Sequence, residues 1–312
     1  MLEIKDLHKR FGPLYAVRGI SFKVNQGEVL GFLGPNGAGK STTMRMITGF
    51  LPPTSGTALV NGFDVVNDPT NAKRQIGYLP ENAPVYGDMT VTHFLRFTAE
   101  VRGYAGRERN RHVDAVIEKA RLEKVRHQSI GTLSKGYRQR VCLAQAILHD
   151  PPILIMDEPT DGLDPNQKHV VRSMIREMAA RKVIVISTHI LEEVEAICSR
   201  AIIITNGRIV ANGTPDELKA HSDSHGAVEV TVKHPTDRVA ADLGALSSAA
   251  RVESEGNTFT VYPRDPARLF ADVTQLMKQR DWQATGLKQV EGRLDDVFRE
   301  LTLKDESFRK AG

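Results

Sequence analysis

Short apolar or alternating segments recur along the chain, and their lengths predict strands. Residues 2–5 and 20–24 alternate apolar and polar positions, with Ile20 and Val24 on one face of the second segment. Val29 to Leu33 forms a continuous run that is typical of a strand buried on both faces. Further strands are predicted at 57–61, 76–79, 153–157, 183–188 and 201–205.

Helical periodicity separates several of these strands. A helix is predicted from Gly39 to about Thr48, where Gly49 and Pro52 end it. Between residues 90 and 150 the apolar positions recur at helical spacing. The mixture predicts an α/β core with a partly parallel sheet, into which an all-helical block is inserted.

The pattern changes after about residue 221. Residues 221–226 have the composition of a linker, and the segments of residues 227–303 follow the order β, α, β, β, α, β. This order predicts a small C-terminal α+β domain of the ferredoxin-like type. Its segments are predicted at 228–232, 236–247, 250–254, 258–262, 266–279 and 284–290. The first domain is expected to span residues 1–220, with a helical subdomain at about 82–150.

Composition narrows the possible functions. The 312 residues are 40% hydrophobic and 26% charged, which suffices for a core, and the formal charge of +4 is too small to favour a nucleic-acid partner. No apolar run approaches the roughly 18–20 residues of a membrane-spanning helix. The first five residues alternate and lack the apolar core of a signal peptide. Cys142 and Cys198 lie among apolar neighbours and are interpreted as reduced core thiols. A cytoplasmic protein is therefore expected.

A glycine-rich loop after the strand 29–33 carries the strongest chemical signal. Residues 34–41 fit the pattern G-x-x-x-x-G-K-[ST], in which backbone N–H groups and a helix N-terminus bind phosphate. Lys40 is expected to reach the β- and γ-phosphates, and the Ser41 hydroxyl to bind Mg²⁺. The predicted ATP contacts are Gly34, Pro35, Asn36, Gly37, Ala38, Gly39, Lys40, Ser41 and Thr42.

Two carboxylates end the apolar strand at 153–157. Asp157 is expected to hold the magnesium shell, and Glu158 to orient or deprotonate the attacking water. On its own this segment also suits a strand that enters a solvated loop. Together with the loop at Gly34 it indicates nucleotide hydrolysis.

Several spaced motifs resemble those of the ABC (ATP-binding cassette) ATPases, and the resemblance covers about residues 2–220. The sequence Leu-Ser-Lys-Gly-Tyr-Arg-Gln-Arg at 133–140 is similar to the family signature. The other motifs are an adenine-stacking aromatic at Phe11, Walker B running into the D-loop at 157–160 and 162–165, and a switch histidine at 187–189.

This resemblance implies an ATPase whose active sites are shared between two subunits. Glu158 and His189 would act in catalysis together with Lys40. The signature closes on the γ-phosphate of the opposite subunit, so the resemblance implies a head-to-tail homodimer. Ser134, Gly136 and Asp164 are then further nucleotide contacts.

Two positions depart from the family pattern. Lys135 replaces a signature glycine, and it either adds a cation to an anion-facing helix start or points to solvent. Glu81 stands where the general family has glutamine after the strand 76–79. A carboxylate retains an oxygen for Mg²⁺, so Glu81 joins Ser41 and Asp157 as an expected ligand, but it loses the amide donor and adds negative charge near the phosphates.

Three segments resemble the ATPase subunits of ABC-2 type exporters, especially the gliding-motility-associated and multidrug-export groups. They are 78–82, 133–137 and 294–298, although the last also suits an ordinary amphipathic helix. The resemblance implies a peripheral subunit on the cytoplasmic face of the inner (cell) membrane that powers a separate integral-membrane permease. The alternative is a soluble ABC ATPase acting on nucleic acid or ribosomes. The single set of motifs argues against that alternative, and the chain does not specify the transported substrate.

A docking surface for the permease is expected directly after Glu81. Residues 82–89 form a loop that carries Pro84, Val85, Tyr86 and Met89. Apolar loop residues of this kind often mark a binding surface. The alternative is that they pack against the first helix of the helical block.

Overall fold

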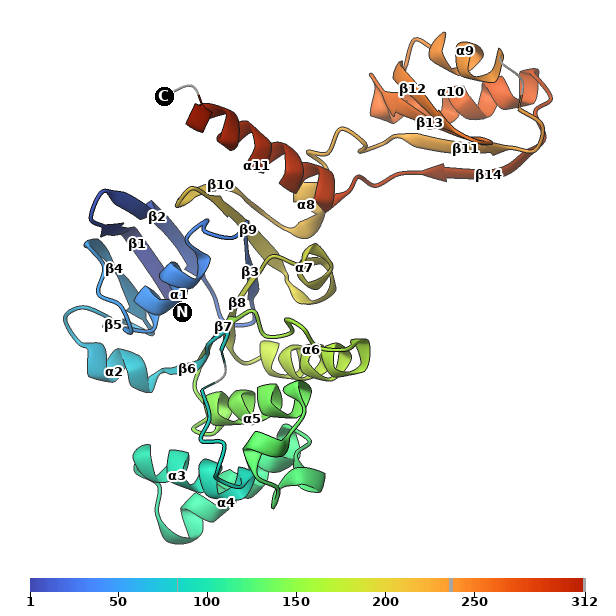
Figure 1. Cartoon of the computed structure of the whole chain (residues 1–312). Coiled ribbons are helices and arrows are strands. Elements are labelled where there is room, and N and C mark those ends of the chain that lie inside the picture. Colours follow the sequence, from blue (N-terminus) through green and yellow to red (C-terminus); the bar gives the residue numbers. More distant parts are fainter. Residues whose placement is uncertain (83, 236–237, 311–312) are drawn as a thin grey trace. The chain divides into compact units, whose positions relative to one another are not determined.

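The computed structural model describes residues 1–82, 84–235 and 238–310, with side chains described as far as residue 302. The chain divides into two compact units, Met1–Asn212 and Gly213–Gly312 (Figure 1). Within the described residues, no helix has the length and apolar character that crossing a membrane requires.

The first unit opens with a four-stranded antiparallel sheet in the order β2-β1-β4-β5. Its strands are β1 (Leu2–Phe11), β2 (Leu14–Val24), β4 (Ser55–Val60) and β5 (Phe63–Asp64). Both β1 and β2 are longer than the alternation predicted. Register shifts such as the one between Ile4 and Leu7 interrupt the two-residue period, so the pattern reveals only part of each strand.

A six-stranded sheet in the order β10-β9-β3-β8-β7-β6 forms the centre of this unit. Its strands are β3 (Val29–Leu33), β6 (Ile76–Leu79), β7 (Ile153–Asp157), β8 (Val183–Thr188), β9 (Arg200–Thr205) and β10 (Arg208–Gly213). The β3, β6, β7, β8 and β9 strands pair in parallel, so their carboxyl ends meet at one edge. In α/β sheets that edge is where ligands bind. The predicted partly parallel core is confirmed.

The helices of the first unit cover this sheet and form the inserted block. Those around the sheet are α1 (Lys40–Ile47), α2 (Pro69–Arg74), α6 (Pro165–Ala179) and α7 (Leu191–Ile197). The block comprises α3 (Val91–Val101), α4 (Gly106–Lys119) and α5 (Lys135–Ile147), which pack on one another (Figure 1). Short 3₁₀ turns at Glu123–Val125 and Ile130–Thr132 connect α4 to α5. One continuous core, which includes Phe22, Phe32 and Met44, joins the two sheets.

The second unit has the predicted βαββαβ order. It contains β11 (Val228–Val232), α9 (Arg238–Gly244), β12 (Ala249–Glu255), β13 (Thr258–Pro263), α10 (Pro266–Gln279) and β14 (Ala284–Gln289). The sheet order β12-β13-β11-β14, antiparallel throughout, is that of a ferredoxin-like domain. Of the helix predicted at 236–247, positions 236–237 lie outside the described residues, and α9 ends at Gly244. The short α8 (Pro215–Lys219) packs against α11 (Leu294–Lys310) within this unit.

Candidate nucleotide site

The phosphate-binding loop leaves β3 at Leu33 and enters α1 at Lys40. Gly39 has a φ of 105°, and a Cβ atom there would lie 2.4 Å from the carbonyl oxygen of Ala16. Only glycine accepts this conformation and this contact. Gly39 is also the N-cap of α1, and no side chain caps the helix there. The first N–H groups of α1 therefore remain available to an anion.

Lys40 is 6% exposed and lies over its own loop. Its Nζ donates to the carbonyl oxygens of Gly34 at 2.7 Å and Pro35 at 3.3 Å. Glu158 Oε1 lies 3.9 Å from the same nitrogen. Burial lowers the pKa of Lys40, and the nearby carboxylates of Glu158, Asp157 and Glu81 oppose that effect. Phosphate oxygens would replace weak carbonyl acceptors with charged ones.

Asp157 ends β7 and is 1% exposed. Its Oδ1 accepts a hydrogen bond from Ser41 Oγ at 3.2 Å and another from Ser187 Oγ. No separate role was predicted for Ser187. Only the parallel register of β7 and β8, which the structure provides, places Ser187 opposite Asp157. A hydroxyl and a carboxylate thus converge beside the start of α1.

Glu158 follows Asp157 in a left-handed conformation with a φ of 50°. Such a backbone is strained by roughly 1–3 kcal/mol in a residue other than glycine, and it is typical of functional sites. The turn directs the carboxylate toward both Lys40 and His189. Glu158 Oε2 lies 3.0 Å from His189 Nδ1. The glutamate is 8% exposed, whereas the histidine side chain is 47% exposed.

Glu81 and Phe11 lie at the margins of this site. Glu81 is exposed and follows β6 and Pro80, close enough for its charge to act on Lys40. In the described part of the chain, no hydrogen bond joins Glu81 to Ser41 or Asp157. Phe11 ends β1 and is 46% exposed. It pairs with Leu14 at the tip of the β1–β2 hairpin, and β2 then brings Ala16 against Gly39.

The signature and D-loop residues form a second cluster. Ser134 caps α5 by accepting a hydrogen bond from Tyr137 N at 3.4 Å, and Asp164 caps α6 by accepting from Gln167 N at 3.0 Å. Gly136 is buried against Gln167, so the two helix starts touch. Among the described residues, no hydrogen bond or ion pair links Ser134, Gly136 or Asp164 to the loop 34–41.

Lys135 lies at the first position of α5 with its side chain half exposed, and its ammonium forms an ion pair that the sequence did not predict. Its Nζ lies 3.3 Å from Asp161 Oδ2, and the two side chains are 55% and 48% exposed. The ammonium also lies against Gly162, where a Cβ atom would be 2.1 Å away. The signature helix and the D-loop are therefore joined by an ion pair.

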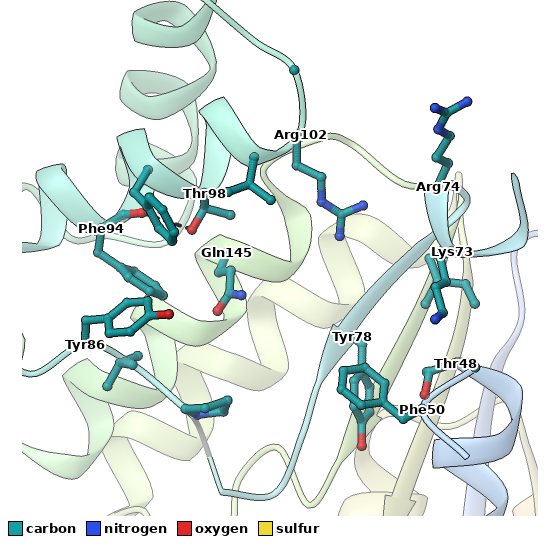
Figure 2. Close-up of a pocket in the computed structure, with 17 residues that line it drawn as sticks. Thr48, Phe50, Lys73, Arg74, Tyr78, Tyr86, Phe94, Thr98, Arg102 and Gln145 are labelled. Carbon is teal, nitrogen blue, oxygen red and sulfur yellow. Dashed lines mark hydrogen bonds between the residues drawn. The ribbon is translucent and has the colours of Figure 1, made fainter. Parts of the chain in front are cut away.

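A groove of about 1140 Å³ lies between the sheet core and the helical block (Figure 2). Its exposed large hydrophobic side chains are Phe50, Val101, Tyr86 and Phe97, with exposed fractions of 72%, 70%, 58% and 41%. The ring centroid of Tyr86 lies 5.7 Å from that of Phe97 and 6.2 Å from that of Phe94. It therefore packs on α3, as the second alternative for the segment 82–89 expected, and it also lines the groove. Docking of the permease at this segment remains a prediction.

Three cations also line this groove. Lys73, Arg74 and Arg102 all line it, and Figure 2 shows Arg102 pointing into the space between α3 and β6. Arg102 retains solvent access, but burial around its guanidinium lowers its pKa. None of the carboxylates that the structure describes forms an ion pair with Arg102.

Comparison with known proteins identifies the family. The family model described as "ABC transporter" matches residues 17–161. The Nod factor export ATP-binding protein I of Ralstonia nicotianae is 36% identical over 97% of this chain and 94% of its own length. The probable multidrug ABC transporter ATP-binding protein YbhF of Escherichia coli is 40% identical over 71% of this chain and 38% of its own.

Solved structures agree with this assignment. An ATP-binding subunit of an ABC transporter superposes with a TM-score of 0.64 at 35% identity, covering 70% of this chain and 92% of that one. The phosphate loop, the carboxylates at the end of β7 and the histidine after β8 all lie in the unit Met1–Asn212. The chain therefore belongs to the family of ATP-binding subunits of ABC transporters, and it is an ATPase of that family.

Proposed function

We propose that this chain is the ATP-hydrolysing subunit of an ABC-2 type exporter and that it works as a head-to-tail homodimer on a separate membrane permease. It would lie on the cytoplasmic face of the cell membrane, held there by the permease. The observation that carries the proposal is the convergence of Lys40, Asp157, Glu158 and His189 at the carboxyl edge of the parallel sheet. The export functions in the names of the relatives support the exporter assignment.

The described contacts suit hydrolysis of ATP. The loop 34–41 and the start of α1 would hold the phosphates, with Lys40 turning from its loop carbonyls to the β- and γ-oxygens. Glu158 would accept a proton from the attacking water as the bond to the β-phosphate oxygen breaks, leaving ADP and phosphate. His189, at 3.0 Å from Glu158, would orient that carboxylate and contact the γ-phosphate.

Magnesium fits the residues beside this loop. Mg²⁺ is held in such sites by one or two protein oxygen ligands together with substrate phosphates and water. The Ser41 hydroxyl and the Asp157 carboxylate, 3.2 Å apart, offer such a pair. Glu81 would be a further ligand, and its charge already acts on the neighbouring Lys40. When bound, the ion supplies charge neutralisation at the β- and γ-phosphates.

A second copy of the chain would complete each active site. Ser134 and Gly136 lie at the start of α5, and Asp164 lies at the start of α6, apart from the loop that binds the phosphates. The helix start offers N–H groups to an anion. We assign these three residues to the γ-phosphate side of the partner subunit's nucleotide.

The groove beside Tyr86 is the proposed docking site of the permease. Its occupant would be an amphipathic helix whose apolar face covers Phe50, Tyr86 and Val101. A carboxylate on that helix would pair with Arg102, for which the described residues supply none. The groove thus combines an exposed apolar patch with an unmatched charge.

The proposal is tested by purifying the complex from membranes. A tagged Glu158→Gln variant, extracted in detergent with ATP, should retain one polytopic membrane protein at fixed stoichiometry. The wild-type complex should hydrolyse ATP in liposomes. Retention of ribosomes or nucleic acid in place of a membrane protein would identify the chain as a soluble ABC ATPase. Absence of steady-state ATP turnover would indicate a nucleotide-binding regulatory module.

We also propose that residues 1–220 suffice for nucleotide binding, while the domain at 227–303 has another role. Each phosphate-site residue lies in the unit Met1–Asn212. A chain ending at Ala220 should bind a fluorescent ATP analogue within about threefold of the full-length affinity, which is within roughly 0.7 kcal/mol. A second chain ending at Asn212 tests whether α8, which packs on α11, matters. Insoluble protein from both truncations would show that the two units share a core.

A further inference from the structure

The helix that follows His189 carries a buried carboxylate. Glu193, on α7, is 1% exposed, and its Oε2 accepts a hydrogen bond from Thr188 Oγ1 at 3.3 Å. Its Oε1 lies 3.8 Å from Arg172 Nη2 on α6. Burial raises the pKa of Glu193, and the charges of Arg172 and Lys168 oppose that rise. A fully buried glutamate is rare unless it is paired, so its presence requires an explanation.

Thr188 connects this carboxylate to the turn that carries His189. Thr188 ends β8 and is fully buried, and its hydroxyl accepts a hydrogen bond from the backbone N–H of Ile190 at 3.0 Å. The Thr188 hydroxyl therefore binds the backbone just after His189 and, at the same time, the carboxylate of Glu193, which fixes the turn 188–190. Because the imidazole itself is half exposed, the turn has to set the direction in which it points.

Arg172 extends the same contact to α6, the helix that follows the D-loop. Arg172 belongs to α6, which begins directly after Asp164. Its Nε and Nη2 atoms and Oε1 of Glu193 have no hydrogen-bond partner among the described residues. The charges attract each other at 3.8 Å, but the pair lies outside hydrogen-bond distance. Buried polar atoms of this kind are seldom left unpaired without a functional reason.

We propose that Glu193, together with Thr188 and Arg172, is a positioning residue for His189. It fixes the turn 188–190 and ties that turn to α6, so the histidine faces Glu158 only when α6 and the D-loop are in place. Glu193 touches neither nucleotide nor reacting atoms, so it acts only through His189. The inference rests on the proposed role of His189 in hydrolysis.

Three variants of the full-length chain separate the components of this contact. Glu193→Gln keeps an oxygen for Thr188 and loses the charge facing Arg172, whereas Glu193→Ala removes both. Glu192→Gln changes the exposed neighbour on the same helix and serves as the control. We expect kcat to fall by about 10–100-fold in Glu193→Ala, since a misplacement of about 1 Å can have that effect, with KM for ATP nearly unchanged. Glu192→Gln should behave as wild type.

A double-mutant cycle with His189→Ala tests the route of the effect. If Glu193 acts through His189, Glu193→Gln should lower kcat in the wild-type background and leave it unchanged in the His189→Ala background. An equal fold-loss in both backgrounds would overturn the inference and indicate a general effect on packing. Thr188→Val should follow the pattern of Glu193→Gln, and Thr188→Ser, which keeps the hydroxyl, should restore activity.

A spectroscopic readout separates this inference from the proposed ATPase mechanism. With ¹⁵N-labelled histidine, the His189 ring resonances are assigned by their loss in His189→Ala. Glu193→Gln should shift them, while Glu192→Gln should not. Unchanged resonances overturn the positioning role even if kcat falls. Shifted resonances combined with full activity of His189→Ala would support positioning and reject the catalytic role of His189.

Discussion

The phosphate site and the groove beside Tyr86 lie on the same compact unit, but they differ in how far their side chains are exposed and in whether their charges are paired. At the phosphate site, Lys40, Asp157 and Glu158 are each less than 10% exposed, and each contacts another polar group of the chain. In the groove, Phe50, Val101 and Tyr86 are each more than half exposed, and none of the carboxylates within the described residues pairs with Arg102.

This difference indicates how far each site is completed by one chain. Buried charges that already contact one another are preorganised, so a bound nucleotide needs only to replace their present hydrogen-bond partners with phosphate oxygens. Exposed aromatic groups and an unmatched cation gain their contacts only when a partner supplies them. Substitutions in the two regions should therefore affect different measurements.

The largest expected effect is on hydrolysis by Glu158→Gln. The amide keeps the shape of the side chain and loses the proton acceptor, so kcat should fall by about 10²–10⁴-fold. ATP binding should persist, because the charge opposing the γ-phosphate is also removed. Steady-state ATPase assays measure the first effect, and size-exclusion chromatography with ATP should show an accumulated dimer. Near-normal turnover would remove Glu158 from the catalytic role.

Lys40→Ala should affect binding itself. The substitution removes a charge-assisted contact to phosphate, which is typically worth about 1.5–3 kcal/mol, so ATP affinity should fall by roughly 10–150-fold. Titration with a fluorescent nucleotide checks this, with Lys73→Ala in the groove as the charge-matched control. Unchanged affinity in Lys40→Ala would show that the loop backbone alone holds the phosphates.

Tyr86→Ala should reverse the pattern seen at the phosphate site. Basal ATPase of the isolated subunit should stay within about twofold, while assembly with the permease should weaken roughly tenfold, as for an aromatic anchor at an interface. Val66→Ala, which alters an exposed residue outside the groove, is the control. Arg102→Glu should weaken assembly similarly, and a basic substitution on the permease helix should restore it. Normal assembly of both variants would place docking elsewhere.

Local motifs made the phosphate site predictable. The loop 34–41 is contiguous in sequence, and parallel strands bring their carboxyl ends to one edge, so Asp157 and His189 had to approach it. The βαββαβ order of the second unit was also predictable, because each of its segments shows the hydrophobic period of a strand or of a helix. The nucleotide and metal roles of the individual residues remain predictions.

Contacts between distant segments were beyond sequence reasoning. The pairing of Glu193 with Thr188 and Arg172 depends on how α6 and α7 pack, and neither helix reveals that in its own pattern. The strand extensions past residues 5 and before 20 were missed because bulges break the alternation. The groove required the relative placement of α3, α2 and β6, which no single segment encodes.

The smallest expected effect concerns the ion pair of Lys135 with Asp161. Both groups are about half exposed, so the pair contributes at most about 1 kcal/mol and weakens with salt. A cation at the first position of α5 opposes the helix dipole, and Asp161 compensates for it. Asp161→Asn should therefore change thermal stability by only a few degrees. It should also free Lys135 to approach the γ-phosphate of the nucleotide bound by the partner subunit. The ATP concentration needed for dimerisation should therefore fall by up to about fivefold. The exchanged variant, Lys135→Asp with Asp161→Lys, tests whether the ion pair or the cation matters, because it restores the pair but puts a carboxylate at the helix start. If dimerisation needs only the pair, this variant will match wild type in ATP-dependent size-exclusion chromatography. If it needs the cation, the variant will require more ATP than wild type.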